Sequence, residues 1–262
     1  MHPSKVLALT LYGVLSAIAA PIEDWVTTLT QISESALESW APYTQLTKAC
    51  DAVPGFEPSL AAGDGNYVQY YFVGYWPTNN AVVVAHQGID PLKFESLFID
   101  IEIVQTHLDS ALFPGVPSNV MVHEGFADEP AKTAQIILAE VQNLGLISQH
   151  GATEVFIVGH SLGGALAELD CLYLTLNLPS NIHIKGQTYG TPRVGNPAYA
   201  SSFDSRINDF VRINNVRDPI PTLPGEFLGF SHVQGEIHIV SDSASDTSDV
   251  ALRVPRQRRC YG

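Results

Sequence analysis

Residues 153–176 constrain the fold of this chain more strongly than any other stretch. A short run rich in β-branched side chains, 153–158, leads directly into Gly-His-Ser-Leu-Gly at 159–163, and an Ala- and Leu-rich stretch follows. This order predicts a buried strand, a sharp turn and a helix. The two glycines allow a turn too tight for side chains, and the serine between them is then presented at the top of the sheet.

Ser161 is therefore the candidate nucleophile of the chain. The helix that begins at Leu162 directs its positive end toward the place where an oxyanion would form. The alternative is an ordinary serine in a glycine-rich turn, but the strand before the motif and the helix after it favour the nucleophile.

The composition points to one acidic domain outside the cell. The 262 residues suffice for a single large α/β domain, and a net charge of −14 argues against nucleic-acid binding. Residues 1–20 combine Lys5, an apolar run and small residues before Pro21, the pattern of a secretion signal. The apolar run is too short for a membrane span. We therefore expect a signal peptide at 1–20, a single domain at 21–262 and a secreted protein without a transmembrane segment.

Three cysteines, Cys50, Cys171 and Cys260, bear on the compartment and on metals. Cys171 lies inside the predicted helix and is expected to be a buried free thiol. A disulfide between Cys50 and Cys260 is a hypothesis from their number alone. With no C-x-x-C pair, a zinc site is not expected, and nothing else in the sequence implies a metal or a cofactor.

The remaining pattern predicts an α/β domain whose central, mostly parallel sheet is flanked by helices. Helices are expected at 22–39, 128–148, 165–176 and 197–203, and strands at 67–73, 81–86, 153–158, 182–189, 210–213 and 236–240. The turn at 77–80 makes a hairpin of the first two strands, and 52–65 is expected to be a loop.

One short amphipathic segment is a candidate lid. Phe94, Leu97, Phe98 and Ile101 recur at helical spacing between charged residues. Such a segment fits a mobile cover over an apolar cleft. The alternative is a surface helix with its apolar face on the core.

A serine nucleophile needs an acid and a base, and the acid is the easier of the two to assign. In this class of fold the acid and then the histidine follow the nucleophile along the chain. Asp218 lies on a loop after the strand at 210–213, as the acid should. Asp204 and Asp209 are rivals, but the first lies on a predicted helix and the second precedes its strand.

The base remains unassigned. Only His232 and His238 follow Asp218, one before the strand at 236–240 and one within it. A catalytic histidine in this fold is expected beyond the last strand, so we expect neither to reach Ser161. Residues 241–262 are polar, then basic, and do not resemble a continuation of the domain; the alternative is a flexible charged terminus.

Several motifs in the same order resemble the fungal class 3 lipases, α/β-hydrolases that include triacylglycerol lipases and feruloyl esterases. The resemblance covers about residues 55–240. Its motifs are Pro-Gly-Phe at 54–56, Val-Ala-His-Gln-Gly at 84–88, Val-His-Glu-Gly-Phe at 122–126, the serine motif, Tyr-Gly-Thr-Pro-Arg-Val-Gly-Asn at 189–196, and Asp-Pro-Ile-Pro at 218–221.

The resemblance implies roles for individual residues. Ser161 matches the family's nucleophile and Asp218 its acid, while Leu162 and Ile89 supply the two oxyanion amides. Ile89 stands where the family usually has Ser or Thr, so its backbone N–H alone would serve. The lid maps onto residues 89–101. The family's histidine motif, downstream of the last strand, is absent here, and the stretch 43–50 is shorter than in the family.

The sequence thus predicts a secreted hydrolase of carboxylic esters, foremost a triacylglycerol lipase that forms an acyl-enzyme on Ser161 and works at a lipid–water interface. Feruloyl esterase or cutinase-like activity is the rival within the enzyme class. From another class, the rival is an inactive acyl-binding protein with a lipase fold that lacks the triad histidine.

Overall fold

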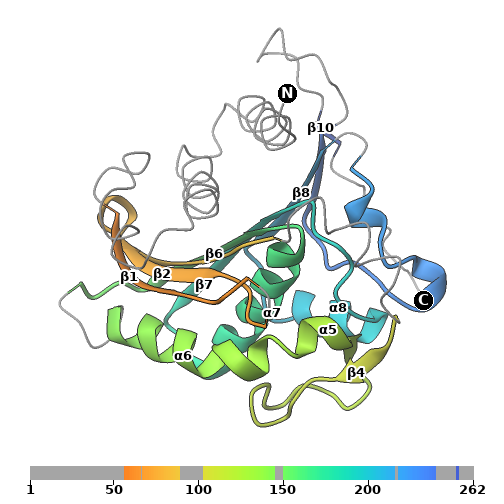
Figure 1. The fold of residues 1–262 in the computed structure, drawn as a ribbon, viewed down its shortest axis with the longest axis horizontal. Helices are drawn as coiled ribbons and strands as arrows, with labels where there is room; N and C mark the ends of the chain where they lie inside the picture. The colour runs from red at the N-terminus through yellow and green to blue at the C-terminus, as the bar shows by residue number, and fades with distance from the viewer. Residues whose placement is uncertain are drawn as a thin grey trace, which may run out of the picture.

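The fold is built on one large twisted sheet. The computed structural model describes residues 56–65, 67–88, 103–144, 150–215 and 218–239, together with the backbone of 252–253. In this part of the chain the large sheet has eight strands, in the order β1-β2-β3-β6-β7-β8-β9-β10 (Figure 1). They are β1 (Glu57–Ala62), β2 (Tyr71–Trp76), β3 (Ala81–His86), β6 (Glu154–His160), β7 (His183–Tyr189), β8 (Phe210–Asn215), β9 (Glu236–Ile239) and β10 (Leu252–Arg253).

The direction of the strands places the loops that matter for function. From β3 to β9 every neighbouring pair is parallel, whereas β1, β2 and β10 pair antiparallel with their neighbours. The loops after β3, β6, β7 and β8 therefore all leave the sheet on the side where the parallel strands have their carboxyl ends. This side is called the carboxyl edge of the sheet below. The expected mostly parallel central sheet is confirmed.

The α-helices of the described chain lie on one face of this sheet (Figure 1). They are α5 (Glu124–Ala127), α6 (Pro130–Gln142), α7 (Leu162–Asn177) and α8 (Pro197–Asp204). Helix α7 packs against β3, β6 and β7, and α6 packs against α7. A small antiparallel sheet of β4 (Gln105–His107) and β5 (Met121–His123) leads into α5.

Two hydrophobic clusters fill the two faces of the sheet. Alternate residues of β3 divide between them: Val82 and Val84 contribute to the cluster under the helices, and Ala81 and Val83 to the cluster on the opposite face. A strand buried on both faces is expected to be apolar at consecutive positions, as β3 is. Helix α7 lies so deep that its first thirteen residues are all buried.

Most of the expected elements are present, with shifted ends. The hairpin of β2 and β3 is confirmed, with the turn at Pro77–Asn79, but its first strand, expected at 67–73, runs from Tyr71 to Trp76. The helix expected at 128–148 begins later, with Pro130 at its first position, and α5 precedes it. The strands at 182–189, 210–213 and 236–240 and the helix at 197–203 are confirmed within one or two residues.

Two strands form where the sequence did not predict them, one before the first expected strand and one near the C-terminus. Residues 57–62, expected in a loop, form β1. This strand has a single strand neighbour, and its register shifts between Pro58 and Leu60, in keeping with the confinement of proline to edge strands and bulges. In the polar C-terminal stretch, Leu252–Arg253 forms β10 against β9, so the main chain returns to the sheet there.

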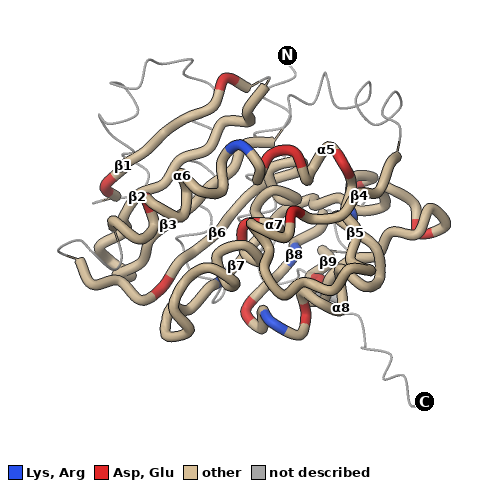
Figure 2. The backbone as a smooth tube through the Cα atoms, turned by 90° about the horizontal axis from the view of Figure 1, so that it is seen from below, with Lys and Arg blue, Asp and Glu red and all other residues tan. Residues whose placement is uncertain are grey.

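Several expectations lie outside the described residues: the signal peptide, the helix at 22–39, the Cys50–Cys260 pair and residues 89–101. Cys171 is a buried free thiol, as expected. In the described part of the chain no helix is long and apolar enough to cross a membrane. Along the described backbone, acidic residues (red) are spread over many helices, strands and loops, whereas basic residues (blue) are few (Figure 2).

Candidate active site

Ser161 lies in the sharp turn between β6 and α7. Its backbone has φ 57° and ψ −124°, a positive-φ conformation that costs energy for a residue with a side chain. A side chain on either neighbouring glycine would clash, because a Cβ on Gly159 would overlap the Gly163 carbonyl and one on Gly163 would overlap the His86 carbonyl. The Ser161 N–H donates to the Tyr189 carbonyl oxygen at 2.9 Å. The sharp turn predicted at 159–163 is therefore present and its backbone is strained; we call this turn the elbow.

The hydroxyl of Ser161 is buried and hydrogen-bonds to no residue that the structure describes. The residue is 3% exposed, and its Oγ has no hydrogen-bond partner in the described chain. Helix α7 begins at the next residue, and its first intrahelical bonds are donated by Gly164 and Ala165 to the Ser161 carbonyl. The amides of Leu162 and Gly163 precede those bonds, at the positive end of the helix.

Asp218 lies at the carboxyl edge of the sheet, as Ser161 does. It follows β8, and its Oδ1 accepts a hydrogen bond from the Ile220 N–H at 2.9 Å. The carboxylate faces Gly190, directly after β7: a Cβ at Gly190 would lie 2.5 Å from Asp218 Oδ2 and 3.6 Å from His160 Nε2. Asp218 therefore stands beside the residue that precedes the nucleophile.

The electrostatics of His160 reflect this proximity. Burial lowers the pKa of the imidazole, and the Asp218 carboxylate opposes that shift. The rival acids lie elsewhere. Asp204 ends α8 and accepts from the Gln234 N–H at 2.9 Å, while Asp209 contacts His183 at the amino-terminal end of β7, the opposite edge of the sheet.

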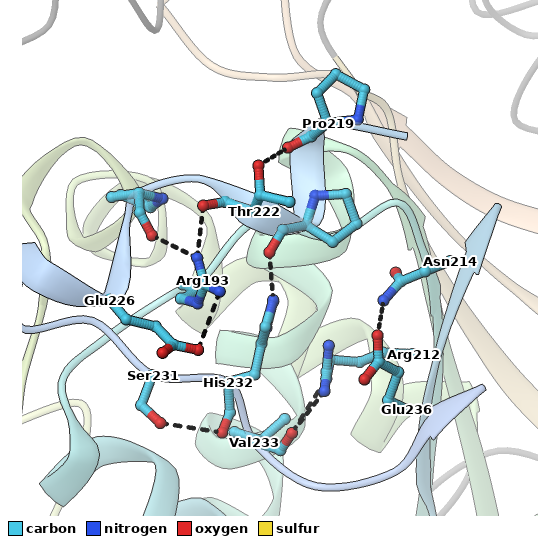
Figure 3. Close-up of polar contacts among 12 residues, drawn as sticks. Arg193, Arg212, Asn214, Pro219, Thr222, Glu226, Ser231, His232, Val233 and Glu236 are labelled. Carbon is cyan, nitrogen blue, oxygen red and sulfur yellow. Dashed lines mark hydrogen bonds and ion pairs between the residues drawn. The ribbon is translucent and has the colours of Figure 1, made fainter. Parts of the chain in front are cut away.

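Neither His232 nor His238 is hydrogen-bonded to the nucleophile. His232 Nε2 donates to the Pro221 carbonyl oxygen at 2.7 Å, and Arg212 lies beside the ring (Figure 3). Burial, with a further contribution from Arg212, lowers the pKa of His232 to about 3, so this imidazole is neutral at ordinary pH and a weak base. His238 lies within β9, opposite Asn214.

The second oxyanion residue, Ile89, and the lid residues Phe94, Leu97, Phe98 and Ile101 lie outside the described residues. The chain is described up to Gly88, immediately before Ile89. A Cβ at Gly88 would lie 3.3 Å from Ser161 Cβ and 2.7 Å from the His160 carbonyl oxygen, so the end of this segment passes directly over the elbow.

A buried pair that the sequence analysis missed lies beneath this region. His86, at the end of β3, contacts Asp170 of α7, with Nε2 and Oδ2 2.7 Å apart. The signal that would have drawn attention to it is an acidic residue at the centre of an otherwise apolar helix, since a buried carboxylate requires a partner.

Comparisons with known proteins agree with this geometry. The model of the family "Lipase (class 3)" matches residues 83–228, more than half of the chain. A secreted mono- and diacylglycerol lipase of Malassezia globosa is 30% identical over 179 residues, which cover 68% of this chain and 58% of the relative. Mono- and diacylglycerol lipase A of Penicillium cyclopium is 32% identical over 178 residues, or 68% of this chain and 54% of the relative. The chain thus spans little more than half the length of these relatives.

Solved structures show the same fold. The lipase–propeptide complex of Rhizomucor miehei superposes with a TM-score of 0.68 at 24% identity, covering 98% of this chain and 73% of that one. A triacylglycerol lipase of Penicillium expansum superposes with a TM-score of 0.63 at 25% identity over 70% of each chain.

Proposed function

Because the chain belongs to the class 3 lipase family, we propose that it hydrolyses carboxylic esters with Ser161 as the nucleophile. One observation carries this proposal above the others. Ser161 is held at a positive φ between β6 and the start of α7, with a hydroxyl that hydrogen-bonds to no described residue. A strained serine at the positive end of a buried helix is characteristic of an acyl-transfer site.

The proposed reaction passes through an acyl-enzyme. Ser161 Oγ attacks the ester carbonyl and loses its proton to a base, and the carbonyl oxygen becomes an oxyanion held by the amides of Leu162 and Ile89. Collapse of this intermediate releases the alcohol and leaves the acyl group on Ser161. Water then adds to the acyl-enzyme and releases the acid. Asp218 would orient the protonated base, and its position beside His160 and Gly190 supports that role.

We propose acylglycerols as the substrates. The relatives reported above are called mono- and diacylglycerol lipases or a triacylglycerol lipase. The apolar positions Phe94, Leu97, Phe98 and Ile101 support a lid and action at a lipid–water interface. The signal-like residues 1–20 and the secreted relatives support export of the protein.

A second candidate function is a non-catalytic acyl-binding protein with the same fold. The observation in its favour is that no described imidazole hydrogen-bonds to Ser161 Oγ, while His232 is held by Pro221. A serine hydroxyl without a base is a poor nucleophile, and loss of one triad member costs several orders of magnitude in rate.

A fluorophosphonate probe and two chromogenic esters separate these functions. The enzyme predicts labelling of Ser161 and turnover of p-nitrophenyl butyrate and octanoate, both abolished in Ser161→Ala. The binding protein predicts uptake of a fluorescent fatty acid without labelling or turnover. Asp218→Asn serves as a second test: it should reduce turnover by about 10⁴-fold while the protein remains folded. Full activity in that variant would contradict Asp218 as the acid.

A further inference from the structure

A buried ionisable pair joins the sheet to the helix behind the nucleophile. His86 Nε2 donates to Asp170 Oδ2 at 2.7 Å, and the two side chains are only 3% and 2% exposed. His86 continues the face of β3 that carries Val82 and Val84 and that α7 covers. Eighty-four residues of sequence separate the partners, so the bond crosses from one layer of the fold to the other.

The histidine of the pair lies next to the strand that leads into the elbow. His86 stands opposite Gly159 in the parallel register of β3 and β6. Two residues later, a Cβ added at Gly88 would lie 3.3 Å from Ser161 Cβ, so the strand end runs close to the nucleophile. On the helix side, Gly163 packs against the backbone carbonyls of His86 and Gln87 without room for a side chain. The end of β3 and the first turn of α7 are therefore in direct contact at this point.

This contact matters because the two proposed oxyanion amides come from different elements. Leu162 begins α7, whereas Ile89 follows β3, and a reactive site must hold such donors within about 0.5 Å of the productive geometry. Hydrogen bonds of the sheet fix β3 against β6. Apart from the close contact at Gly163, α7 packs on the sheet through buried apolar side chains, and apolar contacts are not directional. A charge-assisted hydrogen bond is short and directional.

We propose that His86 and Asp170 are positioning residues: their hydrogen bond fixes the strand end at Gly88 against the first turn of α7, and so holds the end of β3 in a set place relative to the Leu162 amide. The effect of this hydrogen bond on turnover rests on the proposed function. Its effect on the position of the backbone at Gln87 and Gly88 does not. A buried polar pair is commonly no more stabilising than apolar residues of the same volume. Stability alone therefore does not account for the pair.

The test compares three changes in the 262-residue chain. Asp170→Leu breaks the pair, Asp170→Asn keeps an oxygen acceptor, and His86→Phe with Asp170→Leu replaces the pair by apolar side chains. The control is His183→Gln, which removes an exposed histidine that bridges Glu154 and Asp209 at the opposite edge of the sheet. Each variant is measured for Tm, for kcat and KM on p-nitrophenyl butyrate, and for hydrogen exchange of the Gln87 amide, which donates to the Tyr70 carbonyl.

The proposal predicts that kcat and the Gln87 exchange rate depend on the hydrogen bond even where Tm does not. Asp170→Leu should lower kcat at least about tenfold with little change in KM, since a misplacement of about 1 Å can cost about a hundredfold. The double variant should recover the Tm of the wild type but keep the low kcat and a faster exchange at Gln87. Asp170→Asn should stay within about threefold of the wild type in kcat, because the acceptor oxygen remains. The control should be unchanged.

Two results would overturn the proposal. The first is a double variant with the kcat and the Gln87 exchange of the wild type, because activity would then follow stability alone. The second is an unchanged Gln87 exchange in both Asp170→Leu and the double variant. If the wild type shows neither turnover nor labelling of Ser161, the proposed function fails, but the exchange measurement still decides whether the pair holds the strand end.

Discussion

The buried carboxyl of Glu168 predicts how the stability of the protein depends on pH. Glu168 lies within α7 and is 1% exposed. Burial raises its pKa to about 8, although Arg212 and the Tyr199 hydroxyl oppose the shift. Arg212 compensates the carboxylate only in part, because it donates Nε and Nη2 to the Val233 carbonyl at 3.1 and 2.9 Å (Figure 3).

The magnitude follows from the difference between the folded and unfolded pKa values. In the unfolded chain Glu168 titrates near 4.5, and in the folded protein its pKa is about 8. Between these pH values the folded state holds one more proton than the unfolded state, so the free energy of unfolding falls as the pH rises. The contribution is complete below pH 4.5 and is lost as the pH passes 8. At about 1.4 kcal/mol per pKa unit, the total is about 5 kcal/mol.

The substitution Glu168→Gln isolates this contribution, because glutamine has nearly the same shape and does not titrate. In urea unfolding at about pH 5, 7 and 9, the Glu168→Gln variant should gain stability relative to the wild type as the pH rises, by several kcal/mol in total. Glu226→Gln is the control: its side chain is 78% exposed and paired with Arg193, so its difference from the wild type should stay within about 1 kcal/mol. A difference between Glu168→Gln and the wild type that does not change from about pH 5 to about pH 9 would refute the reasoning.

Three further changes test the elbow, a helix cap and the acid. Gly159→Ala places a methyl group on the Gly163 carbonyl and should cost about 3 kcal/mol or more, read as a large drop in Tm; a wild-type Tm would contradict the close approach. The Asn196 side-chain oxygen accepts from the Tyr199 N–H of α8 at 2.8 Å, so Asn196→Ala should lower the free energy of unfolding in urea by about 1 kcal/mol. An unchanged free energy of unfolding would contradict a stabilising cap at Asn196. Gly190→Ser places its Cβ 2.5 Å from Asp218 Oδ2 and should lower ester turnover at least about tenfold beyond its effect on stability. Unchanged kcat in a folded Gly190→Ser protein would argue against Asp218 as the acid.

Local pattern was enough to predict the elements that carry the nucleophile. The strand, the glycine turn and the apolar helix around Ser161 are encoded within residues 153–176, and the structure reproduces them. The run of valines in β3 likewise predicts a strand buried on both faces. Such features depend on the chemistry of neighbouring residues, which is visible in the sequence.

One strand was missed and one helix was expected to begin too early, each for a physical reason. β1 was missed because an edge strand with a proline and a shifted register has no clean alternation. Helix α6 begins later than expected because Pro130 suits the first helical position, and the acids before it belong to the preceding turn. The strand depends on its place in the sheet, whereas the helix start follows a local signal.

What the sequence alone determined is the reactive turn and the class of sheet that supports it. Only the tertiary structure brings the Asp218 carboxylate against Gly190 and joins His86 to Asp170. It also buries Glu168 near Arg212, whose guanidinium already donates to the Val233 carbonyl. Each of these contacts joins elements distant in the chain, and it exists because the order of strands in the sheet brings them together. That order is set by the packing of the whole domain, since no short stretch of residues carries enough buried surface to specify it.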